Sequence, residues 1–306
     1  MTCKEALIIR KEKHVGFIKK IQLKLHIISC DFCKMFTDND IGLLKKRHLS
    51  LEKNIKEEKY DKLPISIGIL SWKSPKKLLG TLLTYLENDL LENVNDVTIL
   101  FNEASDLDIK LAQFFGIHYI AKTKNIGIGQ GFLELAKEAK TDHILILEND
   151  WHLIENKNTT VKQLKSGLDL LNKGFDVVRY RSKNNPGYPH FSFGFKGREL
   201  EYYDEWHQLT SPHLLDAIHW TPLPEVKFRD QIQKEGDYYV TTSRYGNWTN
   251  NPCMFKKNFY ISVIEPFTGE GIDLERKIAY WWPRQNFKVA HGDGLFKHMD
   301  KEKYGK

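Results

Sequence analysis

The stretch His143-Ile-Leu-Ile-Leu-Glu-Asn-Asp-Trp151 decides the fold of this chain. Its four consecutive apolar residues, Ile144 to Leu147, suit a short strand that is buried on both faces, as strands of parallel sheets are. Two carboxylates, Glu148 and Asp150, follow the strand directly. At the carboxyl edge of a parallel sheet, such a pair could hold a divalent cation that neutralises phosphate charge. The same pair is also ordinary in a solvated loop, so the preceding elements must distinguish the two interpretations.

The preceding elements alternate between strands and helices. Ser74 followed by Pro75, and Ser105 followed by Asp108, are typical of helix N-termini. Apolar patterning predicts strands at 63–70, 97–101, 118–121 and 144–147, separated by helices at about 75–86, 106–116 and 129–140. Four strands that alternate with three helices predict an α/β fold with right-handed crossovers and a doubly wound, mostly parallel sheet.

A doubly wound sheet binds ligands where its strand order reverses. If the first strand lies between the second and the fourth (order 3-2-1-4), this crevice lies beyond the carboxyl ends of strands one and four. The loops that would meet there are Ser71-Trp72-Lys73 and Glu148-Asn149-Asp150. A carboxylate pair at the end of the fourth strand is what a nucleotide-diphosphate site with a metal would need.

A glycine-rich run, Asn125 to Gly131, precedes the third helix. It is a poor dinucleotide fingerprint, because its spacing is GxGxG and it follows the third strand, and no Gly-Lys-Ser/Thr of a Walker loop is present. It could be a flexible lead-in to the helix. We favour the alternative that the missing side chains let backbone and helix N-terminus approach a phosphate or a sugar.

Composition sets wider limits. The chain has 306 residues, of which 41% are hydrophobic, so it can bury a sizeable core. No run approaches the ~18 apolar residues of a membrane span, and no apolar signal-peptide core is seen, so we expect a cytoplasmic protein. The chain has four cysteines, for which reduced thiols are the expected state. Cys30 and Cys33 form a CxxC, but no second pair completes a four-sulfur zinc site; redox or metal use of this pair is the alternative.

The net charge of +6 comes from the N-terminal segment. Residues 1–60 hold 14 Lys and Arg against 8 Asp and Glu, and the remaining residues hold 32 of each sign. Basic and apolar residues are interleaved from Val15 to Leu25, and residues 43–59 have helical spacing. This extension could contact an anionic membrane surface or nucleic acid. We expect instead that its apolar face packs on the neighbouring domain, with no nucleic-acid partner and with peripheral membrane contact left open.

The order of these motifs resembles the nucleotide-sugar half of GT-A fold glycosyltransferases of the family-two type. Those enzymes have an extended first strand, an Asp/Asn-x-x-Ser-x-Asp turn after the second, an Asn-x-Gly segment before the third helix and a DxD motif after the fourth strand. The matching residues here are Pro64 to Leu70, Phe101 to Asp106, Asn125 with Gly127 and Gly131, and Leu147 to Asp150. The DxD-like motif departs at its first acid, which is Glu148.

The resemblance implies roles for these residues. Asp150 would be the metal ligand, and Glu148 would contact the donor ribose or the metal. The loops Leu70 to Trp72 and Asn102 to Ser105 would form the nucleoside pocket. The expected donor-binding set is therefore Leu70, Ser71, Trp72, Asn102, Glu103, Ser105, Asn125, Gly127, Gly131 and Glu148.

The pattern is less regular beyond residue 156. A helix at 161–171 and a strand at 177–180 precede an irregular, aromatic loop at 184–195, and a further turn and strand lie before residue 255. In similar transferases this region faces the acceptor. We therefore expect a basic N-terminal extension (1–60), a nucleotide-sugar half (61–156) and an acceptor-binding half (157–306).

Two later clusters resemble catalytic segments of GT-A enzymes. Gly269 to Arg276 is similar to the acidic segment that supplies the base in inverting members; its second acid is replaced by Gly271, so the base shifts to Glu270, with Asp273 in reserve. Glu270 could instead be a capping acid of a surface helix.

A histidine near the C-terminus could complete the metal site, as it often does in GT-A enzymes. His298 is preferred to His291, and either could instead be an ordinary packed or surface histidine. A neutral imidazole suits Mn²⁺ better than Mg²⁺.

We therefore expect a divalent-metal-dependent, inverting glycosyltransferase that moves a sugar from a nucleotide-diphosphate sugar, with a UDP-sugar favoured, to a glycan or other hydroxyl acceptor. Mn²⁺ or Mg²⁺ is the expected cofactor. A sugar-phosphate nucleotidyltransferase is one alternative, although it would carry a glycine-rich loop with a basic residue directly after the first strand. A non-catalytic binding protein that uses the basic N-terminal arm is the other.

Overall fold

The structure is a computed structural model that describes residues 5–7, 10, 17–44, 61–187, 222–269 and 274–299. The expected catalytic acids Glu270 and Asp273 lie outside the described residues. So do most of the helix expected at 43–59 and most of the loop expected at 184–195.

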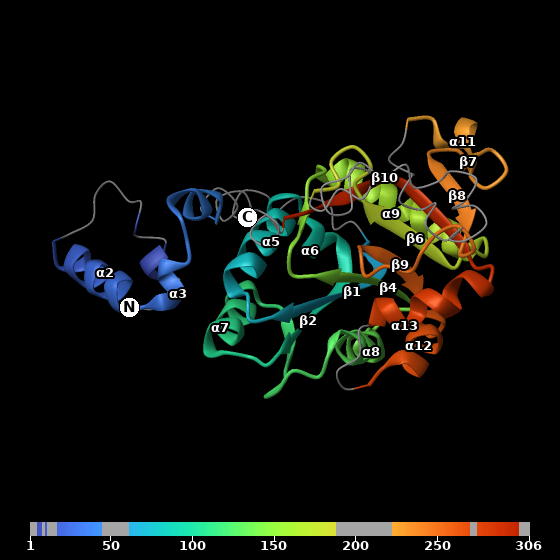
Figure 1. Ribbon diagram of the computed structural model, residues 1–306. Coiled ribbons are helices and arrows are strands. Elements are labelled where there is room, and N and C mark those ends of the chain that lie inside the picture. Colours follow the sequence, from blue (N-terminus) through green and yellow to red (C-terminus); the bar gives the residue numbers. More distant parts are fainter. Residues whose placement is uncertain are drawn as a thin grey trace, which may run out of the picture.

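A parallel four-stranded sheet forms the first half of the fold (Figure 1). Its strands are β1 (Leu63–Trp72), β2 (Val94–Asn102), β3 (His118–Ala121) and β4 (His143–Glu148). The order is β3-β2-β1-β4, and all three neighbouring pairs are parallel. The expected reversal, with the first strand between the second and the fourth, is therefore confirmed, as is the α/β fold class.

The second half of the chain extends the same sheet. Its strands are β5 (Trp151–Leu153), β6 (Val177–Arg181), β7 (Gln233–Glu235), β8 (Tyr238–Thr242), β9 (Cys253–Lys256) and β10 (Lys288–His298). The order continues from β4 as β9-β6-β10-β8-β7, and β9 runs antiparallel to both β4 and β6. The end of β10 also pairs antiparallel with β5. This last pairing returns the C-terminal strand to the acidic turn that follows β4.

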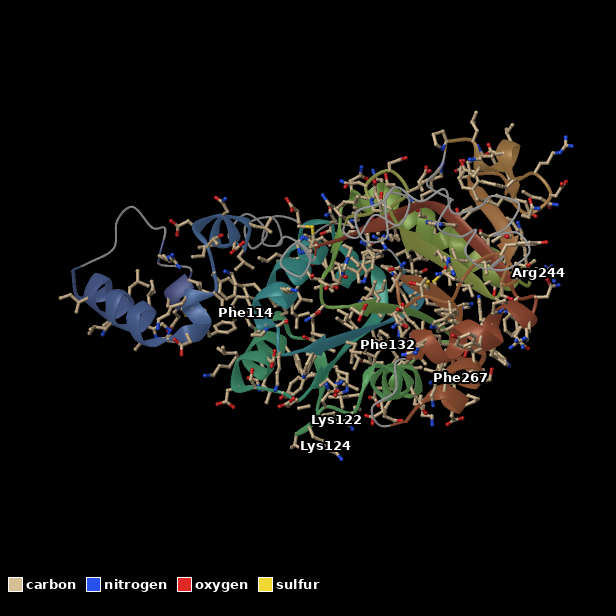
Figure 2. The ribbon with its side chains drawn as sticks, in the orientation of Figure 1. Phe114, Lys122, Lys124, Phe132, Arg244 and Phe267 are labelled. Carbon is tan, nitrogen blue, oxygen red and sulfur yellow. The ribbon has the colours of Figure 1, made fainter. Side chains whose placement is uncertain are left out.

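Helices cover both faces of the sheet, as a doubly wound fold requires (Figure 1). One face carries α5 (Pro75–Glu87), α6 (Leu90–Asn93), α7 (Asp106–Phe115) and α9 (Lys157–Asn172), and the other carries α8 (Ile128–Glu138), α12 (Lys257–Ile264) and α13 (Leu274–Trp281). Successive strand residues point to opposite faces, so Ile69 and Leu147 join the first core while Leu70 and Ile146 join the second. Phe132 of α8, fully buried, lies against this second core (Figure 2).

The helix boundaries agree with the expected caps at α7 but only in part at α5. Ser105 and Asp108 form a capping box at α7, and the helix ends at Gly116 with a φ of 67°. Ser74 is at the N-cap position of α5 with Pro75 in the first turn, but its side chain makes no capping hydrogen bond. Its backbone, at φ −139° and ψ 55°, departs from the extended geometry that directs a cap oxygen to the helix amides.

The described part of the N-terminal extension contains α2 (Phe17–Ser29) and α3 (Asp31–Lys34). The rings of Phe32 and Phe36 lie 5.6 and 5.4 Å from that of Phe114 in α7, which Figure 2 labels on the side toward the extension. The extension thus packs apolar side chains on the neighbouring domain. Among the described helices, none combines the length and the apolar character needed to cross a membrane.

Candidate functional site

The acidic turn after β4 lies beside the end of β1. Glu148 is paired in register with Leu70, and the Asn149 side-chain amide donates to Ser71 Oγ at 3.1 Å. The Thr81 hydroxyl of α5 donates to the Asn149 carbonyl oxygen at 2.8 Å. The two loops that the sequence assigned to the crevice therefore contact each other at the carboxyl edge of the sheet.

Asp150 is held next to His298 by strand pairing. His298 is paired with Trp151 across β10 and β5, and its Nε2 lies 3.3 Å from Asp150 Oδ2. Both side chains are largely buried, with 14% of Asp150 and 15% of His298 exposed. Asp150 Oδ1 is buried and has no hydrogen-bond partner among the described residues. Since a buried carboxylate oxygen without a partner is costly, this atom fits a site that a cation completes.

The Trp151 ring packs against the imidazole of His298. The centres of the two rings are 4.7 Å apart, and the Arg181 guanidinium carbon lies 5.2 Å from the centre of the Trp151 ring. Burial lowers the pKa of Arg181 to about 9. The Tyr85 hydroxyl donates to the Trp151 carbonyl oxygen at 2.8 Å. No role was predicted for Arg181 from the sequence, where its only signal is a basic residue directly after the strand expected at 177–180.

Of the two histidines expected near a metal, only His298 contacts Asp150 in the described structure. His291 is buried, with its Nε2 2.9 Å from the Arg181 carbonyl oxygen. Burial lowers the pKa of His291 to about 4, and the nearby charges of Arg179, Lys183 and Arg181 act in the same direction. The geometry makes His291 a neutral core histidine that donates to a backbone oxygen.

The charges of Glu148 and Asp150 act on different neighbours. Burial, and to a smaller extent the charge of Asp150, raises the pKa of Tyr85 in α5 well above its usual value. The pKa of Tyr260 in α12 is raised by burial and, among smaller effects, by the charge of Glu148. No group of three carboxylate, imidazole or thiol ligands surrounds Asp150 in the described part of the chain. A cation at Asp150 and His298 would therefore have to take its remaining ligands from outside the described side chains.

The loops after β1 and β2 are joined by Glu103. Its carboxylate accepts from Trp72 Nε1 at 3.3 Å and pairs with Lys73 Nζ at 2.7 Å, and these two contacts hold the pKa of Glu103 below its usual value. Lys73 and Glu103 both have positive φ, 46° and 67°. Left-handed backbone at non-glycine residues is often found at binding sites. Trp72 is 52% exposed at this position.

Asn102 fixes the glycine-rich turn before α8. Its Oδ1 accepts from the Ile126 amide at 2.7 Å, and its Nδ2 donates to Asn125 Oδ1 at 2.8 Å. Asn125 Oδ1 also accepts from the Gly127 amide at 2.8 Å. Gly127 has a φ of 84°, which side chains rarely adopt. These bonds connect the end of β2 to the N-terminus of α8 and fix the shape of the turn.

Three residues of the expected donor-binding set, Gly131, Leu70 and Ser105, contribute to packing or helix capping. A Cβ on Gly131 would lie 2.7 Å from Leu70 Cδ1, so glycine lets α8 approach β1 closely. Leu70 itself is buried in the core beneath α8. Ser105 caps α7 by accepting from the Asp108 amide at 3.3 Å. Direct donor contact by these three residues stays a prediction.

Gly269 and Leu274 border the segment that contains Glu270, and both lie close to the start of α8. Gly269 O is 3.9 Å from the position that a Cβ on Gly127 would take, and Leu274 Cδ1 is 3.4 Å from that of a Cβ on Gly129. The residues on both sides of 270–273 are therefore close to the glycine-rich turn.

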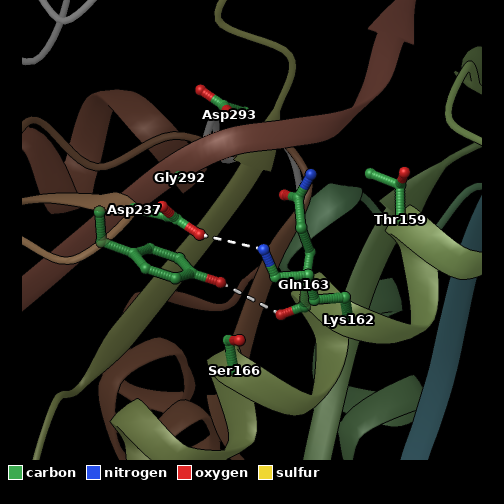
Figure 3. Close-up of a pocket in the computed structure, with 8 residues that line it drawn as sticks. Thr159, Lys162, Gln163, Ser166, Asp237, Gly292 and Asp293 are labelled. Carbon is green, nitrogen blue, oxygen red and sulfur yellow. Dashed lines mark hydrogen bonds and ion pairs between the residues drawn. The ribbon is translucent and has the colours of Figure 1, made fainter.

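A separate hollow of about 160 Å³ lies between α9 and the strands β8 and β10 (Figure 3). It is lined by Thr159, Lys162, Gln163, Ser166, Asp237, Tyr238, Gly292 and Asp293. Two contacts link the residues of its wall. Lys162 and Asp237 form an ion pair of 3.3 Å, and the Tyr238 hydroxyl donates to the Gln163 carbonyl oxygen at 3.1 Å. None of the expected site residues lines this hollow, so it is distinct from the carboxyl-edge site.

Comparison with solved structures identifies the fold. GalNAc-T7 with UDP, GalNAc and Mn²⁺ aligns with a TM-score of 0.50 and 11% identity, over 78% of this chain and 44% of that one. This chain has a GT-A-like glycosyltransferase fold. The mannosyltransferase PcManGT from Pyrobaculum calidifontis, in complex with GDP-Man and Mn²⁺, aligns at a TM-score of 0.49 and 10% identity over 87% of this chain and 67% of that one. TarS 1-349 of S. aureus aligns at 0.46 and 12% identity over 78% of this chain.

The likeness concerns the GT-A-like fold, since the identities are low. The chain spans 60% of the TarS 1-349 chain and 44% of the GalNAc-T7 chain. No protein-family model matches the sequence, and no curated protein matches it either.

Proposed function

We propose that this chain is a glycosyltransferase that moves a sugar from a nucleotide-diphosphate sugar to a hydroxyl acceptor with the help of a divalent cation. The observation that carries the proposal is the buried, unpartnered Oδ1 of Asp150, beside His298 at the edge where the strand order reverses. In an open α/β sheet this edge is where ligands bind.

Asp150 and His298 would hold the cation, with diphosphate oxygens and water as further ligands. An imidazole among the ligands favours Mn²⁺ over Mg²⁺. When bound, the cation would stabilise the negative charge of the departing nucleoside diphosphate. The GalNAc-T7 structure, which contains UDP and Mn²⁺, supports this choice.

The loops after β1 and β2 would bind the nucleoside, with a UDP-sugar as the favoured donor. The exposed Trp72 ring offers a stacking surface, and the Glu103 carboxylate orients it. The turn fixed by Asn102 and Asn125 presents the N-terminus of α8, and helix N-termini favour negatively charged oxygens. Glu148 would contact the ribose or the cation from the neighbouring strand end.

Glu270 would act as the general base on the acceptor hydroxyl, with Asp273 in reserve, in an inverting reaction. The position of Gly269 beside Gly127 supports this assignment, because it brings the preceding residue to the proposed donor site. Residues 157–306 would supply the acceptor-binding half, and a glycan or another hydroxyl compound would be the acceptor.

The alternative of a sugar-phosphate nucleotidyltransferase fits less well. Such an enzyme would use a glycine-rich loop directly after the first strand, whereas β1 is followed by Lys73, Ser74 and Pro75 and the glycine-rich turn follows β3. A binding protein that relies on the basic arm is also less favoured, because Phe32 in α3 and Phe36 just after it pack against Phe114 of α7.

The proposal is tested by thermal unfolding with UDP-, GDP- and CDP-sugars, each with and without Mn²⁺. A ligand that binds only the folded state raises the unfolding temperature. We expect one UDP-sugar to stabilise the wild-type chain only when Mn²⁺ is present, and to release UDP on incubation. If no nucleotide sugar stabilises the protein under either condition, the proposed function is wrong.

A further inference from the structure

His26, Cys30 and Cys33 form a cluster in the N-terminal extension, far along the chain from the carboxyl-edge site. One ligand atom from each residue lies within 4.8 Å of the other two. Within it, Cys33 Sγ and His26 Nε2 are 3.3 Å apart. It is the one group of three or more metal-ligating side chains that the described part of the chain contains.

The local backbone explains why these three side chains converge. His26 lies in the last turn of α2, and the Cys30 amide donates to the His26 carbonyl oxygen at 2.8 Å, so the two residues stand one helical turn apart. Cys30 then adopts extended backbone with φ −102° and ψ 104°, which ends α2 and starts α3. The Lys34 amide donates back to the Cys30 carbonyl oxygen at 3.2 Å, and this short turn brings Cys33 next to His26.

The separations suit a tetrahedral transition-metal ion. Zinc bonds of about 2.3 Å to sulfur and about 2.0–2.1 Å to nitrogen place neighbouring ligand atoms roughly 3.6–3.8 Å apart. The His26–Cys33 separation of 3.3 Å is close to that range and no pair of ligand atoms exceeds 4.8 Å, so side-chain adjustments of about 1 Å suffice. Two thiolates and an imidazole are a ligand set that selects zinc over magnesium or calcium.

The cluster offers three protein ligands and is partly open to solvent. Cys33 is fully buried, whereas Cys30 and His26 are partly exposed, so water could reach a fourth coordination position. Phe32, next to Cys33, packs on Phe36 and Phe114. An ion on the cluster would therefore fix α2 and α3 to each other next to the contact between Phe32 and Phe114 of α7.

We propose that His26, Cys30 and Cys33 bind one Zn²⁺ ion that holds the N-terminal extension in its folded form on α7. Binding releases the two thiol protons, and the thiolates and the neutral imidazole bond to the ion without any redox change. The CxxC alone lacked a partner pair in the sequence; the histidine four residues before Cys30 supplies the third ligand. This site is independent of the proposed transferase chemistry.

The test uses the full-length, reduced protein loaded with Co²⁺, which reports thiolate ligands by an intense near-ultraviolet charge-transfer band and tetrahedral geometry by visible bands. We expect about one thiolate-bound Co²⁺ per chain, displaced by Zn²⁺. Asp150→Asn should keep these bands, since a carboxylate–imidazole site gives no sulfur charge transfer. That variant also separates this proposal from the transferase function.

Variants of the three ligands should lose the bands while matched controls keep them. Cys30→Ser, Cys33→Ser and His26→Gln should each weaken Co²⁺ binding at least tenfold, whereas His26→Cys should retain it. Cys253→Ala and His118→Gln, which change a buried thiol and an exposed histidine elsewhere, should behave like wild type. Circular dichroism of each full-length variant confirms that it is folded.

Two results would overturn the proposal. One is a reduced wild-type protein that shows no thiolate-to-cobalt band at saturating Co²⁺. The other is a band that survives in the folded Cys30→Ser and Cys33→Ser variants.

Discussion

His298 Nε2 lies 3.3 Å from Asp150 Oδ2, although 148 positions separate these residues in the sequence. The contact exists because the last strand, β10, pairs antiparallel with the short β5 that follows the acidic turn. The Met299 amide reinforces it by donating to the Asp150 backbone oxygen at 3.0 Å. The C-terminal strand thereby completes a site that begins at the fourth strand.

Replacing Asp150 with Asn should abolish metal-dependent turnover and leave the fold intact. The amide keeps the size of the side chain but removes the charge that a divalent cation requires. We expect a loss of about 100-fold or more in kcat/KM, at or beyond the upper end of the effects seen when residues around metal ligands are changed. Steady-state release of the nucleoside diphosphate measures it.

A matched control for this variant is Asp142→Asn. Asp142 is an exposed acid at the opposite end of β4, so its loss should leave turnover unchanged. Wild-type activity in Asp150→Asn would refute the metal role of that carboxylate.

His298→Gln should weaken the cation site without removing it. The amide of Gln has an oxygen that can bind a cation but lacks the imidazole nitrogen, so the Mn²⁺ concentration needed for half-maximal activity should rise by about 10–100-fold. Saturating Mn²⁺ should restore most of kcat, which separates a ligand role from general damage.

The matched control for His298→Gln is His291→Gln, which changes the buried histidine that does not contact Asp150. The Mn²⁺ dependence of His291→Gln should equal that of wild type. A larger effect on Mn²⁺ dependence in His291→Gln than in His298→Gln would show that the ligand assignment is wrong.

Gly131→Val should destabilise the fold through the contact between α8 and β1. The added side chain would collide with Leu70, because even a Cβ would lie 2.7 Å from Leu70 Cδ1. Overpacking of this kind costs about 1–3 kcal/mol of unfolding free energy. Urea denaturation measures the loss.

Gly129→Ala is the comparison for Gly131→Val within the same helix. A Cβ at Gly129 would meet its neighbours at ordinary contact distances of 3.4 Å or more. The higher helix propensity of Ala should make this variant equal to wild type or up to about 1 kcal/mol more stable. Equal stability of Gly131→Val and wild type would contradict the packing role of Gly131.

The stability of the protein should fall in mild acid because of His291. Its folded-state pKa of about 4 lies below the ordinary value of 6.5, so the unfolded chain binds a proton that the folded chain rejects. Stability is therefore complete above about pH 6.5 and is lost progressively as the pH falls toward about 4. Between about pH 7.5 and about pH 5 this residue alone should remove about 2 kcal/mol.

Urea denaturation at the two pH values measures this loss, with His291→Gln as the comparison. The Gln amide can still donate to the Arg181 carbonyl oxygen but does not titrate. Its pH-dependent loss should be smaller than that of wild type by about the stated amount. Identical losses in the two proteins would exclude His291 as a source of acid sensitivity.

The periodicity of apolar residues was sufficient to predict the first four strands and the helices between them. Ile144 to Leu147 became β4, and the capping box at Ser105 starts α7 as expected. Local signals of this kind act between residues a few positions apart, so they can be read directly from the sequence. Such signals have a limit at Ser74. The Ser74-Pro75 dipeptide predicted where α5 begins, but not the backbone angles of Ser74, and its side chain makes no capping hydrogen bond.

The candidate site was only partly predictable. The sequence indicated an acidic turn and two possible histidines, of which His298 was preferred, but only the pairing of β10 with β5 places His298 beside Asp150. Likewise, Lys73 with Glu103 and Trp151 with Arg181 are contacts across neighbouring elements, and His26 becomes relevant only when it lies beside Cys33.

The sequence by itself determined which segments become strands and helices, and that two acids follow a buried strand. Only the tertiary structure decided which distant side chains meet those acids. The physical reason is that apolar spacing fixes local structure and burial, whereas strand order and register set the distances between residues remote in the chain. Asp150 and His298 meet because β10 pairs with β5, and the acidic turn lies at the end of β1 because β4 is the neighbour of β1 in the sheet.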